Sequence, residues 1–356
     1  MGISNDVGVD RISNLQSDGS PLQLRAIEKK RKKACISNDG GVDRISNLPS
    51  EILERILFFT GVRQAAQLSV LSSTWKDLWK SMPDLYFDAR DFPPTRDENL
   101  RLVQLTHRVL RHRTWRVRQL RIVIYKEIHQ RIGISPRLWF DFAAQCHAEE
   151  YSLSCLPHSS SSPISGLIGE NPNIIVFGML LRSLSISGIC EPFSAFEAPS
   201  DACPLLEKLS IVGCSFDSIN ISSSRLKQLT LHDCGVFGRL RVATPSLESF
   251  DYRHSFSRVC RLENQPSLRH ASIEINCENW SCDALLGILR AIQNATSITL
   301  PWWTLETYYK QQGSFSCLPT FHNAKHVTLV SHGQRNIILI SDLLQKWPNI
   351  ETLTMR

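Results

Sequence analysis

The most regular pattern in the chain is an alternation of apolar and polar positions that recurs every 20 or 21 residues. Four segments superimpose on their leucines, and the first leucine of each is Leu206, Leu226, Leu247 or Leu268. In each segment apolar residues occupy every second position over a short run, which predicts a β-strand with one buried face. Repetition at this period predicts a solenoid in which each repeat adds one strand to a parallel sheet.

Weaker copies of the same pattern extend the array in both directions. They lie at residues 117–122, 181–186, 295–300, 324–329 and 350–355. Their spacing is longer than that of the central copies, which predicts a helix in the longer units, for example over Asp283–Gln293 or Ile340–Lys346. The Ser-rich stretch Ser154–Gly166 predicts an irregular loop that interrupts the array.

The pattern L-x-x-L-x-L-x-x-N/C is typical of a leucine-rich repeat. Its N/C position falls on Cys214, Cys234, Ser255 and Asn276. Small donors at this position can satisfy backbone carbonyls between stacked turns, which explains these residue types without thiol chemistry. The sequence therefore predicts that residues 117–356 form a curved solenoid with parallel strands.

A shorter segment before the array holds large apolar residues in helices too short to bury them. Pro49 suits the first turn of a helix, where its missing N–H costs nothing. We expect Gly61 to end this helix. The apolar stripe of the helix comprises Ile52, Leu53, Ile56 and Leu57.

Two further apolar segments follow this helix. One runs through Ala65, Ala66, Leu68, Val70 and Leu71, and the other places Trp75, Leu78 and Trp79 on one helical face. Exposed apolar patches on soluble proteins usually mark interfaces, and two tryptophans four residues apart suit an interface hot spot. The segment therefore predicts a protein partner.

This segment resembles an F-box, and the stretch that follows it is similar to the plant-type F-box/leucine-rich-repeat family. The trailing Pro83 and Leu85–Asp88 support the plant-type family in particular, whereas Thr60-Gly61 and Ser73-Thr74 depart from its common residues. The residues that carry the F-box resemblance are Leu48, Pro49, Ile52, Leu53, Ile56, Leu57, Val70, Leu71, Trp75, Leu78 and Trp79.

The resemblance implies a function and a domain organisation. It implies an α/β fold, with a three-helix F-box at residues 38–88, a helical linker at 89–116 and the solenoid at 117–356. The F-box residues would bind a Skp-type adaptor and, through it, a cullin–RING ligase, while the repeats hold an unknown protein target for ubiquitination. We also expect the C-terminal FBD-type domain of many relatives to be absent. The protein itself would be non-catalytic.

The N-terminal residues 1–37 are predicted to be a disordered tail. Residues 3–15 repeat almost unchanged at 36–48, but the first copy continues into Gly, Ser and Pro and cannot form the helix. The basic run Lys29, Lys30, Arg31, Lys32 and Lys33 is either a nuclear-import signal or a solvated charge run.

Composition narrows the cellular setting. Apolar residues make up 42% of the 356 residues, and no apolar run approaches the roughly 18 residues of a membrane span. The eleven cysteines are scattered without a C-x-x-C pair, which favours reduced thiols in the cytosol or nucleus. We therefore expect a nuclear or cytoplasmic protein without a membrane partner.

The positive charge is concentrated in one window. The window from Arg96 to Arg131 contains ten Arg or Lys residues but only three acidic residues. Trp115 among these arginines would suit a nucleic-acid interface. However, Leu102, Leu105, Val109 and Leu110 form a helical stripe that would leave the arginines on a solvated face, so we favour the structural interpretation.

Catalytic and cofactor motifs are missing from the sequence. There is no Gly-rich phosphate loop, H-E-x-x-H, G-x-S-x-G or paired Cys/His cluster, so we expect no cofactor and no metal. Cys146 and His147 are adjacent only in sequence, and Trp302 with Trp303 is expected to pack in the array. The alternatives to a ligase receptor are a nucleic-acid-binding protein or a degenerate repeat scaffold without ligase function.

Overall fold

A computed structural model describes most of the chain beyond the N-terminal tail. It divides the chain into two compact units, Met1–Leu48 and Pro49–Arg356, and all elements below belong to the second. The described residues are 48–68, 82–92, 98–111, 116–125, 137–156, 174–175, 178–189, 193–253, 259–263, 265–275, 282–331 and 337–356.

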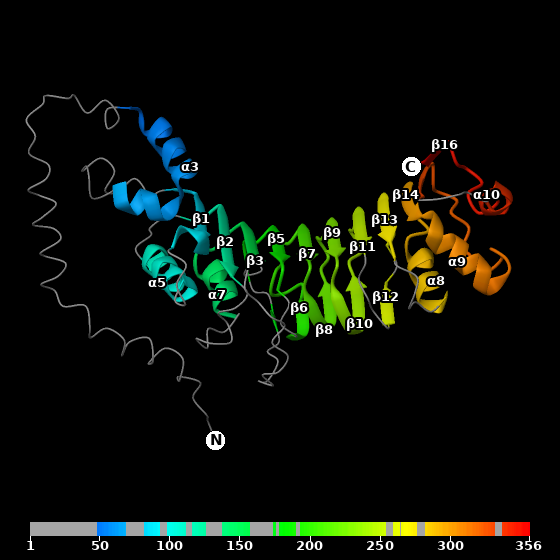
Figure 1. Ribbon diagram of the computed structural model, residues 1–356, viewed down its shortest axis with the longest axis horizontal. Coiled ribbons are helices and arrows are strands. Elements are labelled where there is room, and N and C mark those ends of the chain that lie inside the picture. Colours follow the sequence, from blue (N-terminus) through cyan, green and yellow to red (C-terminus); the bar gives the residue numbers. More distant parts are fainter. Residues whose placement is uncertain are drawn as a thin grey trace, which may run out of the picture. The chain divides into compact units, whose positions relative to one another are not determined.

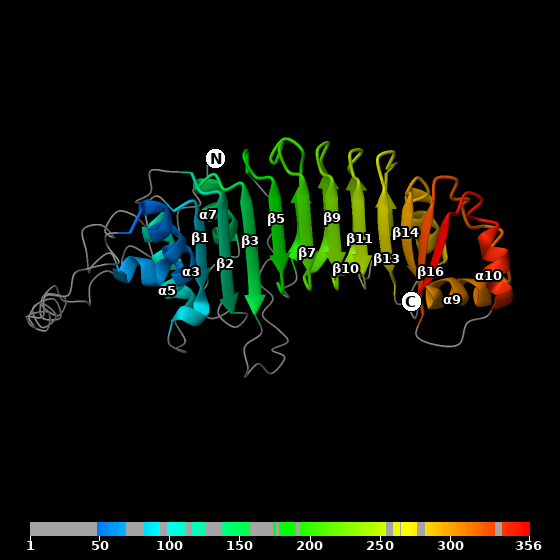
Figure 2. The same cartoon turned by 90° about the horizontal axis from the view of Figure 1, so that it is seen from above.

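The second unit is built on an eleven-stranded sheet in which every strand pair is parallel. Its strands lie side by side in chain order, as Figures 1 and 2 show. They are β1 (Asp84–Asp88), β2 (Gln119–Tyr125), β3 (Glu150–Leu156), β5 (Ser183–Ser187), β7 (Lys208–Val212), β9 (Gln228–His232), β11 (Ser249–Arg253), β13 (His270–Glu274), β14 (Ser297–Pro301), β15 (His326–Val330) and β16 (Thr352–Met355).

Every predicted copy of the repeat contains one of these strands, so the parallel repeat architecture is confirmed. The sheet also contains β1 and β3, which the repeat pattern did not identify. In β3 the aromatic Tyr151 pairs with Leu184 and takes the place of the second leucine of the pattern, and it is buried like the leucines. The prediction of an irregular loop from Ser154 was wrong at its start, because residues 154–156 complete β3.

A second parallel sheet packs with the central strands of the first. It contains β4 (Ile174–Ile175), β6 (Phe193–Ala198), β8 (Ser215–Ser222), β10 (Gly235–Ala243) and β12 (Val259–Leu262), in the order β12-β10-β8-β6-β4.

The second sheet corrects the prediction of one strand per repeat. In β8, Phe216, Ile219 and Ile221 are buried, and Phe196 of β6 meets Phe216 with their ring centroids 5.5 Å apart. Their side chains belong to the same hydrophobic core as the leucines of the first sheet. The central repeats therefore bury apolar residues from two strands each.

The longer units carry helices, as predicted. The two expected helices correspond to α8 (Cys282–Ala291) and α10 (Ile337–Leu344). The remaining described helices are α3 (Ser50–Leu68), the short 3₁₀ helix η1 (Ala89–Asp91), α5 (Glu98–Arg111), α7 (Arg137–Gln145) and α9 (Trp302–Gln312).

The anchor leucines of the four central repeats lie in the core. Leu206, Leu226 and Leu247 have no exposed surface and Leu268 is 2% exposed. Burying one such side chain contributes roughly 1.5–3 kcal/mol relative to leaving it in water. The regular spacing seen in the sequence thus reflects one contiguous core that continues from repeat to repeat.

Turns between the two sheets use left-handed backbone conformations. Gly188 and Gly213 follow β5 and β7 with φ of 73° and 60°, and Asp233 follows β9 with φ of 51°. A side chain at Gly188 would also place its Cβ atom 2.1 Å from the carbonyl oxygen of Cys155. Glycine is therefore required at this turn on both grounds.

The residues that follow Gly213 and Asp233 confirm the predicted role of the repeat cysteines. Cys214 Sγ lies 4.0 Å from the carbonyl oxygen of Ile186, and Cys234 Sγ lies 3.3 Å from that of Ile211. Both carbonyls come from the preceding repeat. Ser255 and Asn276, at the same position, lie outside the described residues.

Candidate functional site: an exposed helix stripe and the open face of the sheet

Helix α3 carries the first half of the predicted docking residues. Pro49 is exposed, and its carbonyl oxygen accepts hydrogen bonds from the backbone N–H of Ile52 and of Leu53, at 3.0 and 3.1 Å. These bonds start the helix immediately after the Leu48-Pro49 pair, as the sequence predicted. Leu48 is half-buried.

The helix does not end at Gly61 but continues to Leu68, which corrects the prediction. A glycine inside a helix costs only about 1 kcal/mol relative to alanine, and packing can offset this amount. Val62, the next residue, is 2% exposed and belongs to the hydrophobic core of the solenoid. Burial of Val62 therefore supports the helix where the sequence favoured a break.

The apolar side chains of α3 point in three directions. Leu53 and Leu57 are buried on one side, and Val62, nine residues after Leu53, lies on roughly the opposite side. Ile52 is 48% exposed and Ile56, one turn later, is half-buried. We refer to Ile52 and Ile56 as the Ile52 stripe. Of the predicted apolar stripe Ile52, Leu53, Ile56 and Leu57, these two side chains are the ones that the protein leaves at least partly in water.

The other predicted docking residues cannot be placed. Val70, Leu71, Trp75, Leu78 and Trp79 lie outside the described residues, as does the basic run Lys29–Lys33. Their roles stay predictions.

The end of the predicted F-box segment joins the sheet. Pro83 precedes β1, and its carbonyl oxygen accepts hydrogen bonds from the backbone N–H of Arg118 and Gln119, at 2.7 and 3.3 Å. Strand β1 then pairs with β2, and α3 contacts β1. The first strand of the solenoid therefore lies inside the segment that the sequence assigned to the F-box.

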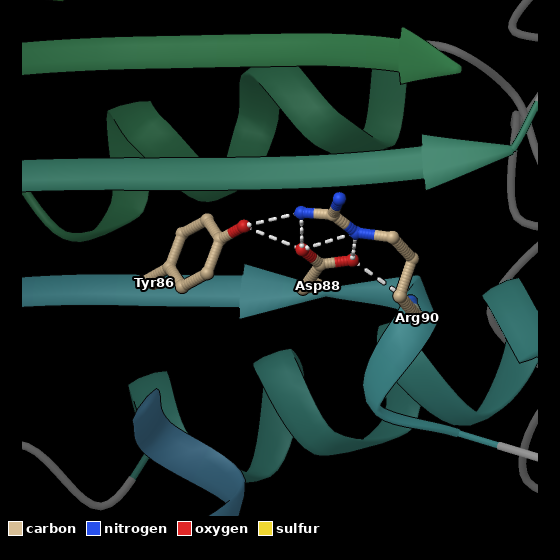
Figure 3. A network of polar contacts seen from close by, with 3 residues as sticks. All are labelled: Tyr86, Asp88 and Arg90. Carbon is tan, nitrogen blue, oxygen red and sulfur yellow. Dashed lines mark hydrogen bonds and ion pairs between the residues drawn. The ribbon is translucent and has the colours of Figure 1, made fainter. Parts of the chain in front are cut away.

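Tyr86, Asp88 and Arg90 form a polar network at the end of β1 (Figure 3). Asp88 is 3% exposed and accepts hydrogen bonds from the Tyr86 hydroxyl, from the Arg90 backbone N–H at 2.8 Å and from Arg90 Nε at 3.0 Å. Arg90 Nη2 also donates to the Tyr86 oxygen at 3.1 Å. The network caps η1 and fixes the chain where it leaves the first strand.

The network sets the charge state of its members. Burial raises the pKa of Asp88, but hydrogen bonds from Arg90 and Tyr86 outweigh burial and bring this pKa below its ordinary value. Burial, with the Asp88 carboxylate second, raises the pKa of Tyr86. Asp88 is therefore ionised at neutral pH and Tyr86 is protonated.

The open face of the eleven-stranded sheet presents short hydroxyl side chains in register. Neighbouring strands align them through the pairing of Ser152 with Ser185, Ser210 and Thr230. Beyond Asp251 the same row continues through Ser272, Thr299, Thr328 and Thr354.

One charged cluster interrupts this polar face near its middle. Asp251 Oδ2 lies 2.9 Å from His232 Nε2, and Asp251 Oδ1 accepts from Arg253 Nε at 3.0 Å. These three residues come from two adjacent strands, β9 and β11.

A second feature of the sheet is a row of charges along the edge where its strands begin. In each repeat, one residue follows the position that Leu206 holds in its own repeat. The backbone N–H of this residue donates a hydrogen bond to the carbonyl oxygen of the equivalent residue in the preceding repeat. The charges of these residues alternate in sign, with one exception. We call this row the charge ladder, and its members are Arg118, Glu149, Arg182, Glu207, Lys227, Glu248, Arg269, Thr296, Lys325 and Glu351.

The charge ladder was missed from the sequence. Each member can be found in the sequence as the residue after the first apolar position of its repeat, as Glu207 follows Leu206. However, the alternation becomes visible only when strand order and register are known, because the longer units separate neighbouring members by up to 33 positions.

The basic window behaves as the structural interpretation predicted. In α5, Leu102 and Val109 are buried, while Arg101, Arg108 and Arg111 are exposed. The tryptophan that would stack on a base, Trp115, lies outside the described residues.

The remaining candidate residues have structural roles. Trp302 is 3% exposed, and Trp303 Nε1 donates to the carbonyl oxygen of Ile275 at 3.2 Å. Cys146 Sγ donates to the carbonyl of Ala143, while His147 is exposed with φ of 52°. Over the described ranges, no group of three or more His, Cys, Asp or Glu side chains suits a metal ion. No described helix is long and apolar enough to cross a membrane.

Comparison with known proteins supports the resemblance drawn from the sequence. Residues 45–86 match the F-box domain family. The chain is 24% identical to the F-box/LRR-repeat protein At3g59210 of Arabidopsis thaliana, covering 86% of this chain and 72% of that protein. It is 26% identical to the F-box protein At3g59000 of the same species, over 86% and 71%. It is 25% identical to the F-box/LRR-repeat protein At5g02910, over 86% and 70%. Proteins named for an F-box and leucine-rich repeats therefore match most of this chain.

Proposed function

We propose that this protein is a non-catalytic substrate receptor of a Skp–cullin–F-box ubiquitin ligase. Its F-box would bind the Skp-type adaptor, and its leucine-rich repeats would bind a target protein. The F-box match at residues 45–86 and the F-box/LRR-repeat homologues support this role in general. The single observation that carries the proposal for this chain is the Ile52 stripe, which keeps apolar surface in water on a helix whose Leu53, Leu57 and Val62 are buried.

The burial pattern of α3 explains why the stripe suits a partner. Val62 belongs to the hydrophobic core of the unit, and Leu53 and Leu57 are buried as well, so the helix does not need the stripe for its own stability. Covering an exposed isoleucine contributes roughly 1–2 kcal/mol to association. This side of the helix therefore gains from a second polypeptide and loses little without one.

The connection between α3 and the sheet explains how the receptor would act. The hydrogen bonds of Pro83, the pairing of β1 with β2 and the contact of α3 with β1 attach this segment to the first repeat. A target bound on the sheet would be held at a fixed distance from the adaptor. Ubiquitin transfer would then be favoured by proximity, since the receptor raises the effective concentration of target lysines near the conjugating enzyme.

Co-purification with a Skp-type adaptor tests the proposal. Ile52→Asp places a charge in the stripe, whereas Gln64→Asp places the same charge on an exposed position of the same helix, about 120° away. We expect Ile52→Asp to abolish co-purification and Gln64→Asp to retain it, with both variants folded by circular dichroism. Equal retention by both variants would refute the docking role of the stripe.

Localisation in the nucleus, the cytoplasm or both is part of the proposal. The support is the Lys29–Lys33 run, which lies in the N-terminal residues. Residues 1–37 fused to a fluorescent reporter should accumulate in the nucleus, and replacing these five residues by glutamine should abolish the accumulation. An even distribution of the wild-type fusion would remove the import signal from the proposal.

A further inference from the structure

The alternation of the charge ladder fails at one position, Thr296. On either side of it stand Arg269 and Lys325, so two positive side chains flank a neutral one. Elsewhere along the described ladder, from Arg118 to Glu248 and from Lys325 to Glu351, each basic member is followed by an acidic one. The site at Thr296 therefore has the cations of the ladder without the carboxylate.

The repeat around Glu207 shows what such a pair of cations holds. Glu207 Oε1 accepts from Arg182 Nη1 at 3.1 Å, and Glu207 Oε2 accepts from Lys227 Nζ at 3.3 Å. The Lys227 hydrogen bond, followed by the charges of Lys227 and Arg182, lowers the pKa of Glu207. One carboxylate thus bridges two cations that lie on the strands to either side.

The backbone at Thr296 repeats this arrangement. The N–H groups of Glu207 and Lys208 donate to the Arg182 carbonyl at 2.8 and 2.9 Å. Those of Thr296 and Ser297 donate to the Arg269 carbonyl at 3.0 and 2.8 Å.

The next step along the sheet is also equivalent. Lys227 N–H donates to the Glu207 carbonyl at 2.8 Å, and Lys325 N–H donates to the Thr296 carbonyl at 2.9 Å. Arg269 and Lys325 therefore stand in the positions that Arg182 and Lys227 hold around Glu207.

The side chains next to Thr296 in the following row of the sheet are polar and carry no negative charge. The Thr296 hydroxyl bonds the Arg269 carbonyl at 3.0 Å, and the next row of the sheet aligns His270, Ser297 and His326. Both histidines are exposed and Ser297 is half-buried.

Two acidic members of the ladder are the neighbours of Arg269 and Lys325. Glu351 bonds Lys325 Nζ at 2.7 Å, and Glu248 precedes Arg269 in the ladder. Among the described residues no carboxylate bonds the Arg269 guanidinium. A lysine ammonium has three donors, so Lys325 can bind a second anion while it keeps Glu351.

We propose that Arg269 and Lys325, with the Thr296 position between them, bind an anionic side chain of the protein target, a carboxylate or a phosphate. The ligand anion would take the place that the Glu207 carboxylate occupies between Arg182 and Lys227. This inference rests on the proposed function, because it names the chemistry by which the repeats recognise a target. Arginine and lysine donors to an oxyanion make charge-assisted hydrogen bonds, which are about twice as strong as neutral ones.

Direct titration of the full-length chain tests the site without the adaptor. The NMR signals of ¹³C-labelled histidine side chains report binding at the site. The variants His270→Gln and His326→Gln identify the signals of these two residues. The probes are capped Gly-Ser-X-Ser-Gly peptides in which X is glutamate, phosphoserine or glutamine, and inorganic phosphate. We expect saturable shifts of His270 and His326 with the glutamate or phosphoserine peptide and none with the glutamine peptide. The stronger of the two anionic peptides identifies the source of the anion.

Four variants separate the site from non-specific charge. Thr296→Glu supplies the missing carboxylate from the protein itself, so it should weaken binding of the anionic peptide at least tenfold and raise the melting temperature. Thr296→Gln has the same size without the charge and should bind like wild type. Arg269→Gln should also weaken binding roughly tenfold, since one of two charge-assisted bonds is lost. Arg225→Gln removes an exposed cation outside the ladder and should have no effect.

Binding that is equal in Thr296→Glu and Thr296→Gln, or the absence of a saturable shift with every anionic probe, would overturn the inference. Adaptor co-purification, measured on the same variants, separates this failure from failure of the proposed function. If Thr296→Glu and wild type both bind the adaptor while neither binds an anion, only the anion site is wrong.

Discussion

The thiol of Cys234 and the carbonyl oxygen of Ile211 lie 3.3 Å apart and connect one repeat to the one before it. Cys234 is 1% exposed, so this donor works inside the core. Replacing Cys234 by alanine removes the thiol and leaves a small void, and we expect a loss of about 1–2 kcal/mol in the free energy of unfolding. Urea denaturation measures the loss. Cys317→Ala, at an exposed cysteine, should change stability by less than about 0.5 kcal/mol, and equal effects would contradict the account.

Two glycines with nearly the same positive φ form a matched pair. Gly188 and Gly313 have φ of 73° and 74°, but only at Gly188 does an added Cβ meet another atom, the Cys155 carbonyl oxygen. Gly313→Ala should cost about 1–2 kcal/mol for the left-handed conformation alone. Gly188→Ala should cost more, because backbone must also move. Equal denaturation midpoints for the two variants would show that the close approach at Gly188 relaxes freely.

The buried carboxylate of Asp88 predicts a pH dependence. Its pKa lies below the ordinary value of 3.8, so its contribution to stability is complete above that value and is lost as the pH falls through the lowered pKa. Asp88→Asn should therefore lower the free energy of unfolding by about 1.5–3 kcal/mol at pH 7, and the difference from wild type should shrink below about pH 4. Chemical denaturation of both proteins between pH 7 and pH 3 measures it. A difference that stays constant over this range would contradict the ionised state of Asp88.

The exposed arginines of α5 test the nucleic-acid alternative. Our account assigns Arg101, Arg108 and Arg111 to a solvated face, so replacing all three by glutamine should leave adaptor binding unchanged. Fluorescence anisotropy with a labelled duplex should show only weak binding at physiological salt. Tight binding that falls steeply with salt and disappears in the triple variant would instead support a nucleic-acid interface.

Much of the fold follows from the sequence because its apolar spacing reports burial directly. Each predicted copy of the repeat contains a strand, since a leucine-like residue at alternate positions has one stable orientation toward the core. Strand β3 escaped this pattern because Ala148 and Tyr151 stand where the pattern has its first and second leucines. The second sheet escaped it because Phe216, Ile219 and Ile221 do not alternate strictly.

The candidate sites were predictable to different degrees. The start of α3 immediately after Pro49 was predictable from turn chemistry, and its apolar stripe was predictable from helical spacing. The continuation of the helix through Gly61 depended on the tertiary burial of Val62. Which isoleucine stays exposed was also a tertiary property. The charge ladder depends on register between distant segments, and no local pattern contains that information.

If another polypeptide covers the Ile52 stripe, position 52 should lose its accessibility to solvent in the complex, and site-specific labelling measures this accessibility. Ile52→Cys and, as the control, Gln64→Cys would be reacted with a maleimide in the free protein and in the complex with a Skp-type adaptor, with mass spectrometry of the α3 peptide as the readout. We predict that both cysteines react in the free protein and that the adaptor slows labelling at position 52 at least tenfold while position 64 stays reactive. Equal labelling at position 52 with and without bound adaptor would contradict the account.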